Sequence, residues 1–170
     1  MNLEKHIRSI PDWPKKGILF YDITTLLADK DAFAEAVKAI SDKYKKKKID
    51  YVAAVEARGF IFGAVVAANL EAGFVPIRKK GKLPSKTESV TYDLEYGTDT
   101  LYVHVDAVKK GARVLMVDDL LATGGTIAAA CKLIEKIGGK IEDVAFLIEL
   151  KGLNGREEIK NYNVSALIQY

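Results

Sequence analysis

Short apolar runs alternate with helical apolar repeats along most of this chain. Apolar runs predict strands at residues 51–55, 74–77, 114–117, 144–148 and 164–168. The uncharged runs at 51–55 and 114–117 are typical of strands buried on both faces. Helical spacing predicts helices over 29–44, over 60–71, and from about 125 to Gly138-Gly139. This alternation predicts an α/β fold, doubly wound around a mainly parallel sheet with helices on both faces.

Weaker patterns predict the peripheral elements. Residues 3–10 are expected to form a short helix ended by Pro11, and residues 18–20 a brief extended piece. Residues 100–105 alternate, which predicts a strand, and residues 151–160 are expected to form a short polar helix. Either Asp29 or Asp31 could cap the helix over 29–44.

Composition restricts the class of protein. With 170 residues and no repeat or linker, the chain is expected to form a single domain over residues 1–170. The net charge of +3 favours small anionic substrates but is too weak to indicate nucleic acid. No apolar run is long enough to cross a membrane, and no signal-peptide pattern begins the chain. We therefore expect no membrane partner and a cytoplasmic location.

Several polar or reactive side chains are expected to be structural. Cys131 is the only cysteine and falls on an apolar helical stripe, which favours a packed thiol. His6 and His104 have no Ser, Cys or metal-ligating partner at a spacing typical of a catalytic or metal site. The lysine-rich run 43–48 fits a solvated helix end, although a nucleic-acid patch is an alternative that lacks stacking aromatics.

The stretch after the strand at 114–117 carries the clearest chemistry. Asp118 and Asp119 are followed by a small-residue loop, Leu120 to Thr126, and then by a helix. Glycines and a helix N-terminus present backbone amides and a partial positive charge, which suit a phosphate. Adjacent carboxylates suit the hydroxyls of a sugar. The loop could instead be a simple connection between the strand and the helix, but the pattern predicts a site for a ribose 5-phosphate group. It is neither a P-loop nor a G-x-G-x-x-G loop.

The segment VLMVDDLLATGGT resembles the ribose-phosphate signature of the type I phosphoribosyltransferases, in its adenine-specific form. The resemblance extends over essentially the whole chain, from about Ile7 to Tyr170. It implies the sheet described above, an N-terminal hood over about residues 1–24, and a mobile lid over about residues 78–97. It also implies a homodimer, and Mg²⁺ bound mainly through 5-phosphoribosyl diphosphate, without a dedicated metal site of protein ligands.

By this resemblance, Asp118 and Asp119 hold the 2- and 3-hydroxyls of the ribose and face the positive charge that develops on it. Leu120 is expected to pack against the base. The 5-phosphate is expected to bind the backbone amides and hydroxyls of the following loop: Ala122, Thr123, Gly124, Gly125 and Thr126.

The segment VEARGFIFG resembles the family loop that grips diphosphate, where a cis peptide exposes backbone amides. The match points to the Glu56–Ala57 bond, and it implies that Arg58 and Gly59 contact the diphosphate. Both residues follow a predicted strand, where ligands of such sheets bind. A simple ion pair between Glu56 and Arg58 is the alternative.

Residues 78–97 are polar and show little periodicity, which is typical of a disordered segment or a functional lid. The motifs RKKGKLP and YDLEYG resemble the mobile catalytic loop of the adenine-specific enzymes. The resemblance implies that Arg78, Lys79 and Lys82 neutralise the diphosphate. Glu95 is expected to act as acid or base on an adenine ring nitrogen, and Tyr96 to close over the reacting centre. A solvated charge is the alternative for Glu95.

The segment IPDWPKKGILFYDIT resembles the hood of the adenine-specific enzymes. The resemblance implies that Phe20 stacks on adenine while backbone groups of Leu19 and Tyr21 bind its edge. Without the resemblance, Trp13 and Phe20 would be packing residues on a surface flap.

Taken over the whole chain, the resemblance implies an enzyme that transfers the 5-phosphoribosyl group from 5-phospho-α-D-ribose 1-diphosphate to adenine, giving AMP and diphosphate in purine salvage. Two alternatives stay open: a phosphoribosyltransferase for a 6-oxopurine or a pyrimidine, and a regulator that uses the fold to sense nucleotides. The hood motif and the motif YDLEYG disfavour the first. The lid residues, and the lack of a helix-turn-helix extension, disfavour the second.

Overall fold

The computed structural model describes residues 1–94 and 97–170, and it divides the chain into two units. The first unit comprises Met1–Ala39 and the second comprises Ile40–Tyr170. In the described residues, none of the helices has the length and apolar character needed to cross a lipid bilayer.

A five-stranded parallel sheet forms the centre of the second unit. Its strands lie in the order β4 (Gly73–Ile77), β3 (Tyr51–Val55), β7 (Arg113–Leu121), β8 (Lys140–Glu149) and β9 (Val164–Gln169). Every neighbouring pair is parallel. Since the strands run the same way, the segments that follow β3, β4 and β7 open at one edge of the sheet, where ligands of such folds bind. The predicted fold class is confirmed.

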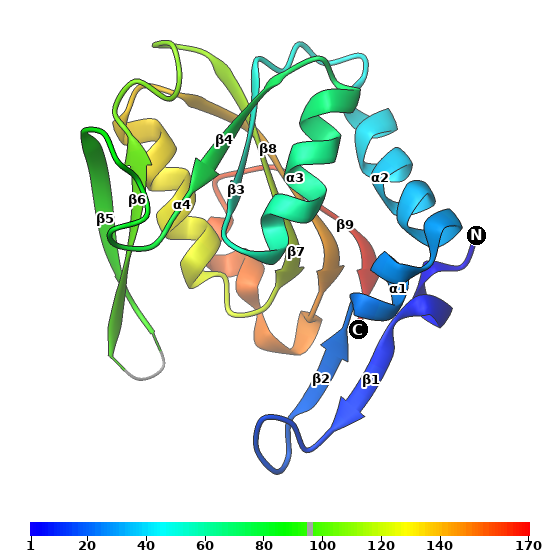
Figure 1. Cartoon of the computed structure of the whole chain (residues 1–170). Helices are drawn as coiled ribbons and strands as arrows, with labels where there is room; N and C mark the ends of the chain where they lie inside the picture. The colour runs from blue at the N-terminus through cyan, green and yellow to red at the C-terminus, as the bar shows by residue number, and fades with distance from the viewer. Residues whose placement is uncertain (95–96) are drawn as a thin grey trace. The chain divides into compact units, whose positions relative to one another are not determined.

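Helices α3 (Arg58–Asn69) and α4 (Gly125–Lys136) cover opposite faces of this sheet (Figure 1). Successive side chains of a strand point to opposite faces. On β3, Ala53 and Val55 belong to the buried core that includes much of α4. Ala54 points to the other face, where its methyl group lies so close to Gly63 of α3 that a Cβ there would be 2.8 Å away.

Strands β5 (Thr87–Asp93) and β6 (Thr98–His104) form a separate antiparallel pair. Leu101 and Val103 of β6 are fully buried in the core that contains α4, and Val90 and Tyr92 of β5 pack against that core. The sequence predicted β6 but not β5, because the polar residues of TESVTYD hide the alternation. Residues 87–93 of the predicted lid are therefore a strand, and not the irregular segment that was expected there.

Two further boundaries differ from prediction. Strand β7 continues through Asp118 and Asp119 to Leu121, which the sequence assigned to a loop, because β8 still pairs with it at Leu120 and Leu121. The single helix expected over 151–160 is instead two 3₁₀ helices, η2 (Lys151–Leu153) and η3 (Gly155–Ile159).

The first unit starts with a 3₁₀ helix, η1 (Leu3–His6), followed by the antiparallel strands β1 (Arg8–Pro11) and β2 (Leu19–Asp22). The helix predicted over 3–10 is therefore wrong beyond His6, because residues 8–11 pair with β2. Helices α1 (Thr24–Ala28) and α2 (Lys30–Tyr44) follow, and α2 continues into the second unit.

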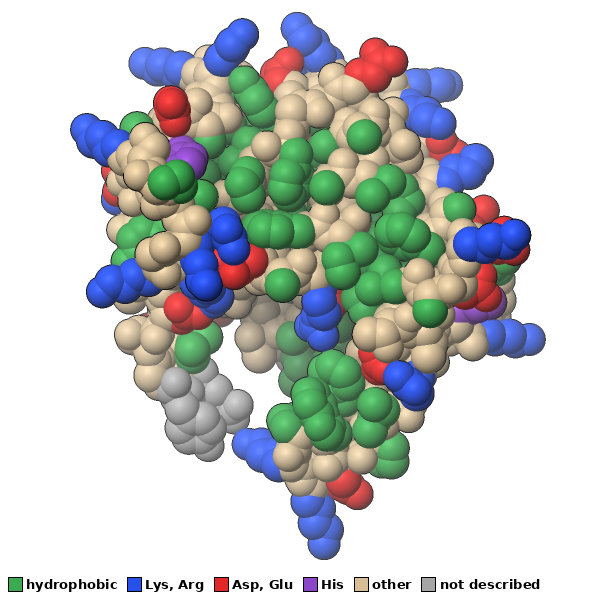
Figure 2. Space-filling view, in the orientation of Figure 1, with side chains coloured by type: hydrophobic (Ala, Val, Ile, Leu, Met, Phe, Trp, Pro, Cys, Tyr) green, Lys and Arg blue, Asp and Glu red, His purple; other side chains and the backbone are tan. Residues whose placement is uncertain are grey.

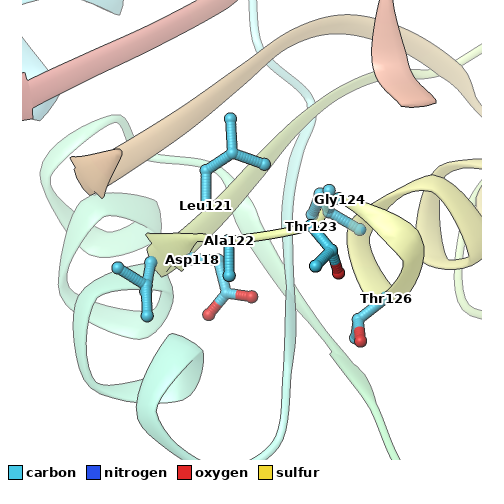
Figure 3. Close-up of a pocket in the computed structure, with 8 residues that line it drawn as sticks. Asp118, Leu121, Ala122, Thr123, Gly124 and Thr126 are labelled. Carbon is cyan, nitrogen blue, oxygen red and sulfur yellow. The ribbon is translucent and has the colours of Figure 1, made fainter. Parts of the chain in front are cut away.

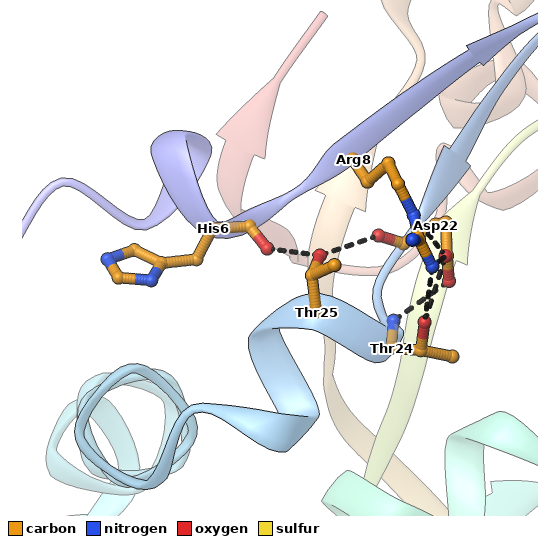
Figure 4. Close-up of polar contacts among 5 residues, drawn as sticks. All are labelled: His6, Arg8, Asp22, Thr24 and Thr25. Atoms are coloured by element: carbon orange, nitrogen blue, oxygen red, sulfur yellow. Dashed lines mark hydrogen bonds and ion pairs between the residues drawn. The ribbon is translucent and has the colours of Figure 1, made fainter.

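Two carboxylates organise the first unit. Asp29 caps α2, since its Oδ1 accepts hydrogen bonds from the backbone N–H groups of Asp31 and Ala32, both at 3.0 Å. Asp22 accepts hydrogen bonds from the Arg8 guanidinium, and from the backbone N–H and the hydroxyl of Thr24 (Figure 4). These bonds, first that from the Thr24 N–H and then that from Arg8, lower the pKa of Asp22 to about 2.

The side chains that were expected to be structural have structural contacts. Cys131 is fully buried in the core. His6 Nδ1 lies 3.2 Å from Asp29 Oδ2, and His104 Nε2 accepts a hydrogen bond from the Ser85 N–H at 3.3 Å. In the run 43–48, Lys47 Nζ lies 2.9 Å from the buried Asp143 carboxylate, and the other lysines are exposed.

Candidate active site

The loop between β7 and α4 forms a small pocket. Gly124 has a φ of +90°, a conformation that glycine adopts without strain, and α4 begins at the next residue. The first amide groups of a helix have no partner within the helix, and they carry a partial positive charge. The pocket has a volume of about 80 Å³. It would hold about two or three water molecules, which suits a phosphate group and is too small for a purine.

Residues from both the strand end and the loop line this pocket. Figure 3 shows the Asp118 carboxylate and the hydroxyls of Thr123 and Thr126 on one side of the chain, with the Leu121 side chain on the other. The lining residues are Asp118, Leu120, Leu121, Ala122, Thr123, Gly124, Thr126 and Ile127. The predicted phosphate-binding residues are therefore brought together, except that Gly125 does not line the pocket and instead starts the helix.

A larger cleft of about 440 Å³ adjoins the small pocket. The two share Asp118, Leu120, Ala122 and Thr126. The end of β3 and the segment after it form the rest of the cleft wall, with Asp119: Val55, Glu56, Ala57, Arg58 and Gly59. Its size lies in the range of small-molecule sites. The arrangement fits a ligand with one phosphate at the end of a larger polar body.

The two adjacent carboxylates occupy different environments. Asp119 is 5% exposed, and its Oδ2 lies 2.8 Å from Arg58 Nε. Asp118 Oδ1 accepts a hydrogen bond from the backbone N–H of Asp119 at 2.9 Å. Burial and the negative charge of Asp119 raise the pKa of Asp118 well above its ordinary value. Burial also raises the pKa of Asp119, although the Arg58 guanidinium opposes this shift.

Gly59 allows α3 to begin beside Asp118. A Cβ at this position would lie 2.7 Å from Asp118 Oδ1, so any larger residue would displace the carboxylate. This contact supports a place for Gly59 in the site. Arg58 pairs with Asp119 across the cleft, which is a partner that the sequence did not predict.

The peptide bond between Glu56 and Ala57 is cis, as the resemblance implied. Glu56 turns toward the segment after β4, where its Oε1 accepts a hydrogen bond from the Lys79 N–H at 2.5 Å. Arg78 Nε lies 3.4 Å from the same oxygen. The acidic residue of the cis peptide therefore orders the two basic residues that were predicted to meet diphosphate.

A series of polar contacts connects Lys79 with the loop of residues 122–126, which will be called the phosphate loop. The Lys79 ammonium pairs with Asp99 of β6, and the Tyr92 hydroxyl donates to Asp99 Oδ2 at 3.4 Å. The Thr126 hydroxyl in turn donates to the Tyr92 hydroxyl at 3.2 Å. The hydrogen bond from Lys79 is the main cause of the lowered pKa of Asp99. Neither Tyr92 nor Asp99 was predicted from the sequence to belong to the site, although Tyr92 starts the motif YDLEYG.

Comparison with known proteins places the chain in a family. A family model described as the phosphoribosyl transferase domain matches residues 22–168. The adenine phosphoribosyltransferase of Brachyspira hyodysenteriae is 58% identical over 170 residues, which is 100% of both chains. The chain belongs to the adenine phosphoribosyltransferases.

Solved structures of this family agree with the fold. The crystal structure of adenine phosphoribosyltransferase from Thermoanaerobacter pseudethanolicus superposes with a TM-score of 0.95 at 51% identity, covering 99% of this chain and 98% of that one. The Saccharomyces cerevisiae enzyme gives a TM-score of 0.92 at 37% identity, covering 97% of this chain and 96% of that one. The latter structure contains D-2,5-dideoxy-2,5-imino-altritol 1,6-bisphosphate and adenine.

Three of the remaining predicted site residues belong to the first unit. Leu19, Phe20 and Tyr21 are in β2 of the first unit, where the Phe20 ring meets Trp13 edge-on with centroids 4.4 Å apart. Lys82 is exposed in the segment after β4. Glu95 and Tyr96 lie outside the described residues, so their predicted roles stay predictions.

Proposed function

We propose that this chain transfers the 5-phosphoribosyl group of 5-phospho-α-D-ribose 1-diphosphate to adenine, giving AMP and diphosphate. The observation that carries the proposal is the phosphate-sized pocket opening beside two adjacent carboxylates into a larger cleft. The proposal also rests on full-length relatives that are adenine phosphoribosyltransferases.

The 5-phosphate occupies the small pocket, held by amides of the phosphate loop (Ala122–Thr126) and the hydroxyls of Thr123 and Thr126. This places the ribose over Asp118 and Asp119, whose oxygens accept hydrogen bonds from the 2- and 3-hydroxyls. The bond between the anomeric carbon and diphosphate breaks through a state with positive charge on the sugar. Nearby carboxylates stabilise that charge, so positioning and electrostatics supply the catalysis without a protein nucleophile.

Arg58 changes its partner during this cycle. It is paired with Asp119 at 2.8 Å, and a diphosphate in the cleft offers it a more highly charged partner. Arg78, Lys79 and Lys82 bind the remaining diphosphate charge. The described residues contain no group of three or more His, Cys, Asp or Glu that could hold a metal ion. Asp118 and Asp119 would be the nearby oxygen donors for a Mg²⁺ ion that entered with the substrate, and the ion would supply neutralisation of the negative charge on the leaving diphosphate.

The base is held by the hood. Phe20 stacks on adenine, backbone groups of Leu19 and Tyr21 bind its edge, Leu120 packs against it, and Glu95 exchanges a proton with a ring nitrogen. These roles rest on the resemblance of the hood and lid motifs. They predict that Phe20→Ala raises the KM for adenine while leaving the KM for phosphoribosyl diphosphate within about twofold.

The enzyme acts as a homodimer in the cytoplasm. An outward face of α3 supports the dimer, because the exposed side chains between the two polar ends of the helix, Arg58 and Asn69, are apolar: Ile61, Ala64, Val65 and Ala68. Ile61 and Val65 are 37% and 38% exposed. Figure 2 shows hydrophobic side chains gathered over this helix. Exposed apolar patches of this kind are typical of interfaces between proteins.

The deciding experiment is a spectrophotometric assay of adenine, hypoxanthine, guanine and uracil, each with phosphoribosyl diphosphate and Mg²⁺. We expect turnover with adenine, at a kcat/KM at least about a hundredfold above that of the other bases. A preference for hypoxanthine or guanine would instead identify a 6-oxopurine enzyme. Binding of phosphoribosyl diphosphate without turnover of any base would identify a nucleotide-sensing regulator.

A further inference from the structure

The phosphate loop rests against a second turn from a distant part of the chain. This turn, Leu153–Arg156, links η2 to η3 and will be called the backing turn. A Cβ at Gly155 would overlap the carbonyl oxygen of Ala122, and one at Gly124 would overlap the carbonyl oxygen of Gly155. In both cases the distance from the added Cβ to the carbonyl oxygen would be less than 3.0 Å, which is shorter than Cβ contacts found in proteins. The two backbones therefore touch with no side chain between them.

The reason for a glycine differs between the two positions. Gly124 has a φ of +90°, so its conformation alone favours glycine. Gly155 lacks a positive φ, and any residue could adopt its backbone conformation. The close approach to the Ala122 carbonyl, and to Leu121 Cδ1 beside it, explains why position 155 carries no side chain.

Side-chain contacts of Arg156 attach the backing turn to β8 and β9. Arg156 forms a two-point ion pair with the buried Glu149 at the end of β8, with Nε–Oε1 and Nη2–Oε2 distances of 2.6 and 2.7 Å. Its Nη1 also donates to the Val164 carbonyl of β9 at 3.1 Å. The Gln169 side chain completes the group by donating to Glu149 Oε2 at 3.0 Å. Paired planar contacts of this kind restrict orientation as well as distance.

We propose that the backing turn is the template that shapes the 5-phosphate site, with Gly155 and Arg156 as positioning residues. The inference rests on the proposed function. Amides bind a phosphate well only if they converge before it arrives, because reorganising the loop would reduce the binding energy. The Gly124 turn is held on its outer side by the Gly155 backbone, and Gly155 is held by Arg156 through Glu149. The described side chains of the backing turn do not line the phosphate pocket.

The test compares Gly155→Ala with Gly152→Ala. Gly152 lies three residues earlier, and an added Cβ there would meet nothing within 4 Å. For Gly155→Ala we expect the KM for phosphoribosyl diphosphate to rise by about tenfold or more, while the KM for adenine changes by less than about twofold. Calorimetric binding of ribose 5-phosphate should weaken in parallel. Gly152→Ala should match the wild type in all three measurements.

Arg156→Lys provides a second variant if Gly155→Ala fails to fold. Lysine keeps the charge but cannot reproduce the two-point contact with Glu149. We expect the same selective rise in the KM for phosphoribosyl diphosphate, and weaker binding of ribose 5-phosphate.

The inference is wrong if folded Gly155→Ala behaves like Gly152→Ala, or if both KM values rise together. If Gly155→Ala does not fold, Arg156→Lys decides by the same criteria. Failure of the proposed function is a separate result, because the wild type would then neither use adenine nor bind ribose 5-phosphate.

Discussion

Single carboxyl groups in this protein are placed either for stability or for binding, and their pKa shifts distinguish the two cases. Asp118 is half-buried beside Asp119, and its pKa is raised because burial and a like charge oppose ionisation. Asp22 receives hydrogen bonds from Arg8 and Thr24, and its pKa is lowered to about 2. The free energy of unfolding therefore depends on the two groups with opposite sign as pH changes.

Asp118→Asn should increase the stability of the folded state at pH 8 and reduce turnover. A raised pKa in the folded state means that stability is complete below the unfolded pKa of 3.8 and is lost as pH rises through the folded value. Removing the charge should therefore raise Tm at pH 8, with a smaller gain near pH 4. The kcat should fall by about a hundredfold or more, because the sugar loses a nearby negative charge. Calorimetric Tm values and initial rates measure both effects. A lower Tm at pH 8, or near-normal turnover, would contradict the assignment.

Asp22→Asn should have the opposite effect on stability and lower it near neutral pH. A lowered pKa contributes stability above the unfolded pKa of 3.8, and that stability is lost as pH falls toward about 2. The variant should have a lower Tm than the wild type at pH 6, and the difference should shrink by pH 3. Asp31→Asn is the control, since Asp31 is an exposed acid in α2. If Asp22→Asn lowered Tm equally at pH 6 and pH 3, hydrogen bonding to ionised Asp22 would not be the cause of the lost stability.

At the scale of elements, the contact between the β5–β6 pair and the phosphate loop is the feature to test. Tyr92 joins the two through Thr126 and Asp99. Tyr92→Phe removes these bonds and keeps the ring. A net loss of roughly 0.5–1.5 kcal/mol per bond, or about 1–3 kcal/mol for the two bonds, predicts that amide hydrogens of β5 exchange about five- to 150-fold faster. Tyr102→Phe in β6 is the control. Unchanged exchange in β5 would mean that Tyr92 does not restrain this strand.

The sequence predicts elements best where apolar periodicity is unbroken, as in β3 and α4. It places the end of β7 wrongly because the pairing of Leu120 and Leu121 with β8 is a long-range interaction. For the site, Asp118, Asp119 and the phosphate loop are evident from local pattern. The Arg58–Asp119 pair and the approach of Gly155 to Ala122 are not, because each joins residues that only the folded sheet brings together.

At the scale of the whole molecule, the apolar face of α3 predicts self-association. Val65→Glu places a charge in the proposed interface, where an unpaired buried charge is strongly unfavourable. We expect the wild type to elute as a dimer, and Val65→Glu as a folded monomer, in size-exclusion chromatography with light scattering. Val105→Glu is the matched control, since Val105 is a valine with similar exposure, 37%, outside this face. A Val65→Glu variant that stays dimeric would exclude α3 as the interface.

The pairing of β7 with β3 has a consequence for how the enzyme is made. Tyr51 lies beside Val114, which is 63 positions later (114 − 51), whereas β5 and β6 are near neighbours in sequence. Closing a long loop is entropically unfavourable and slow compared with pairing adjacent strands. The β5–β6 pair should therefore acquire protection early in refolding, and the substrate cleft only in the final steps. A nascent or partly refolded chain would then not bind phosphoribosyl diphosphate before the chain is able to catalyse its reaction.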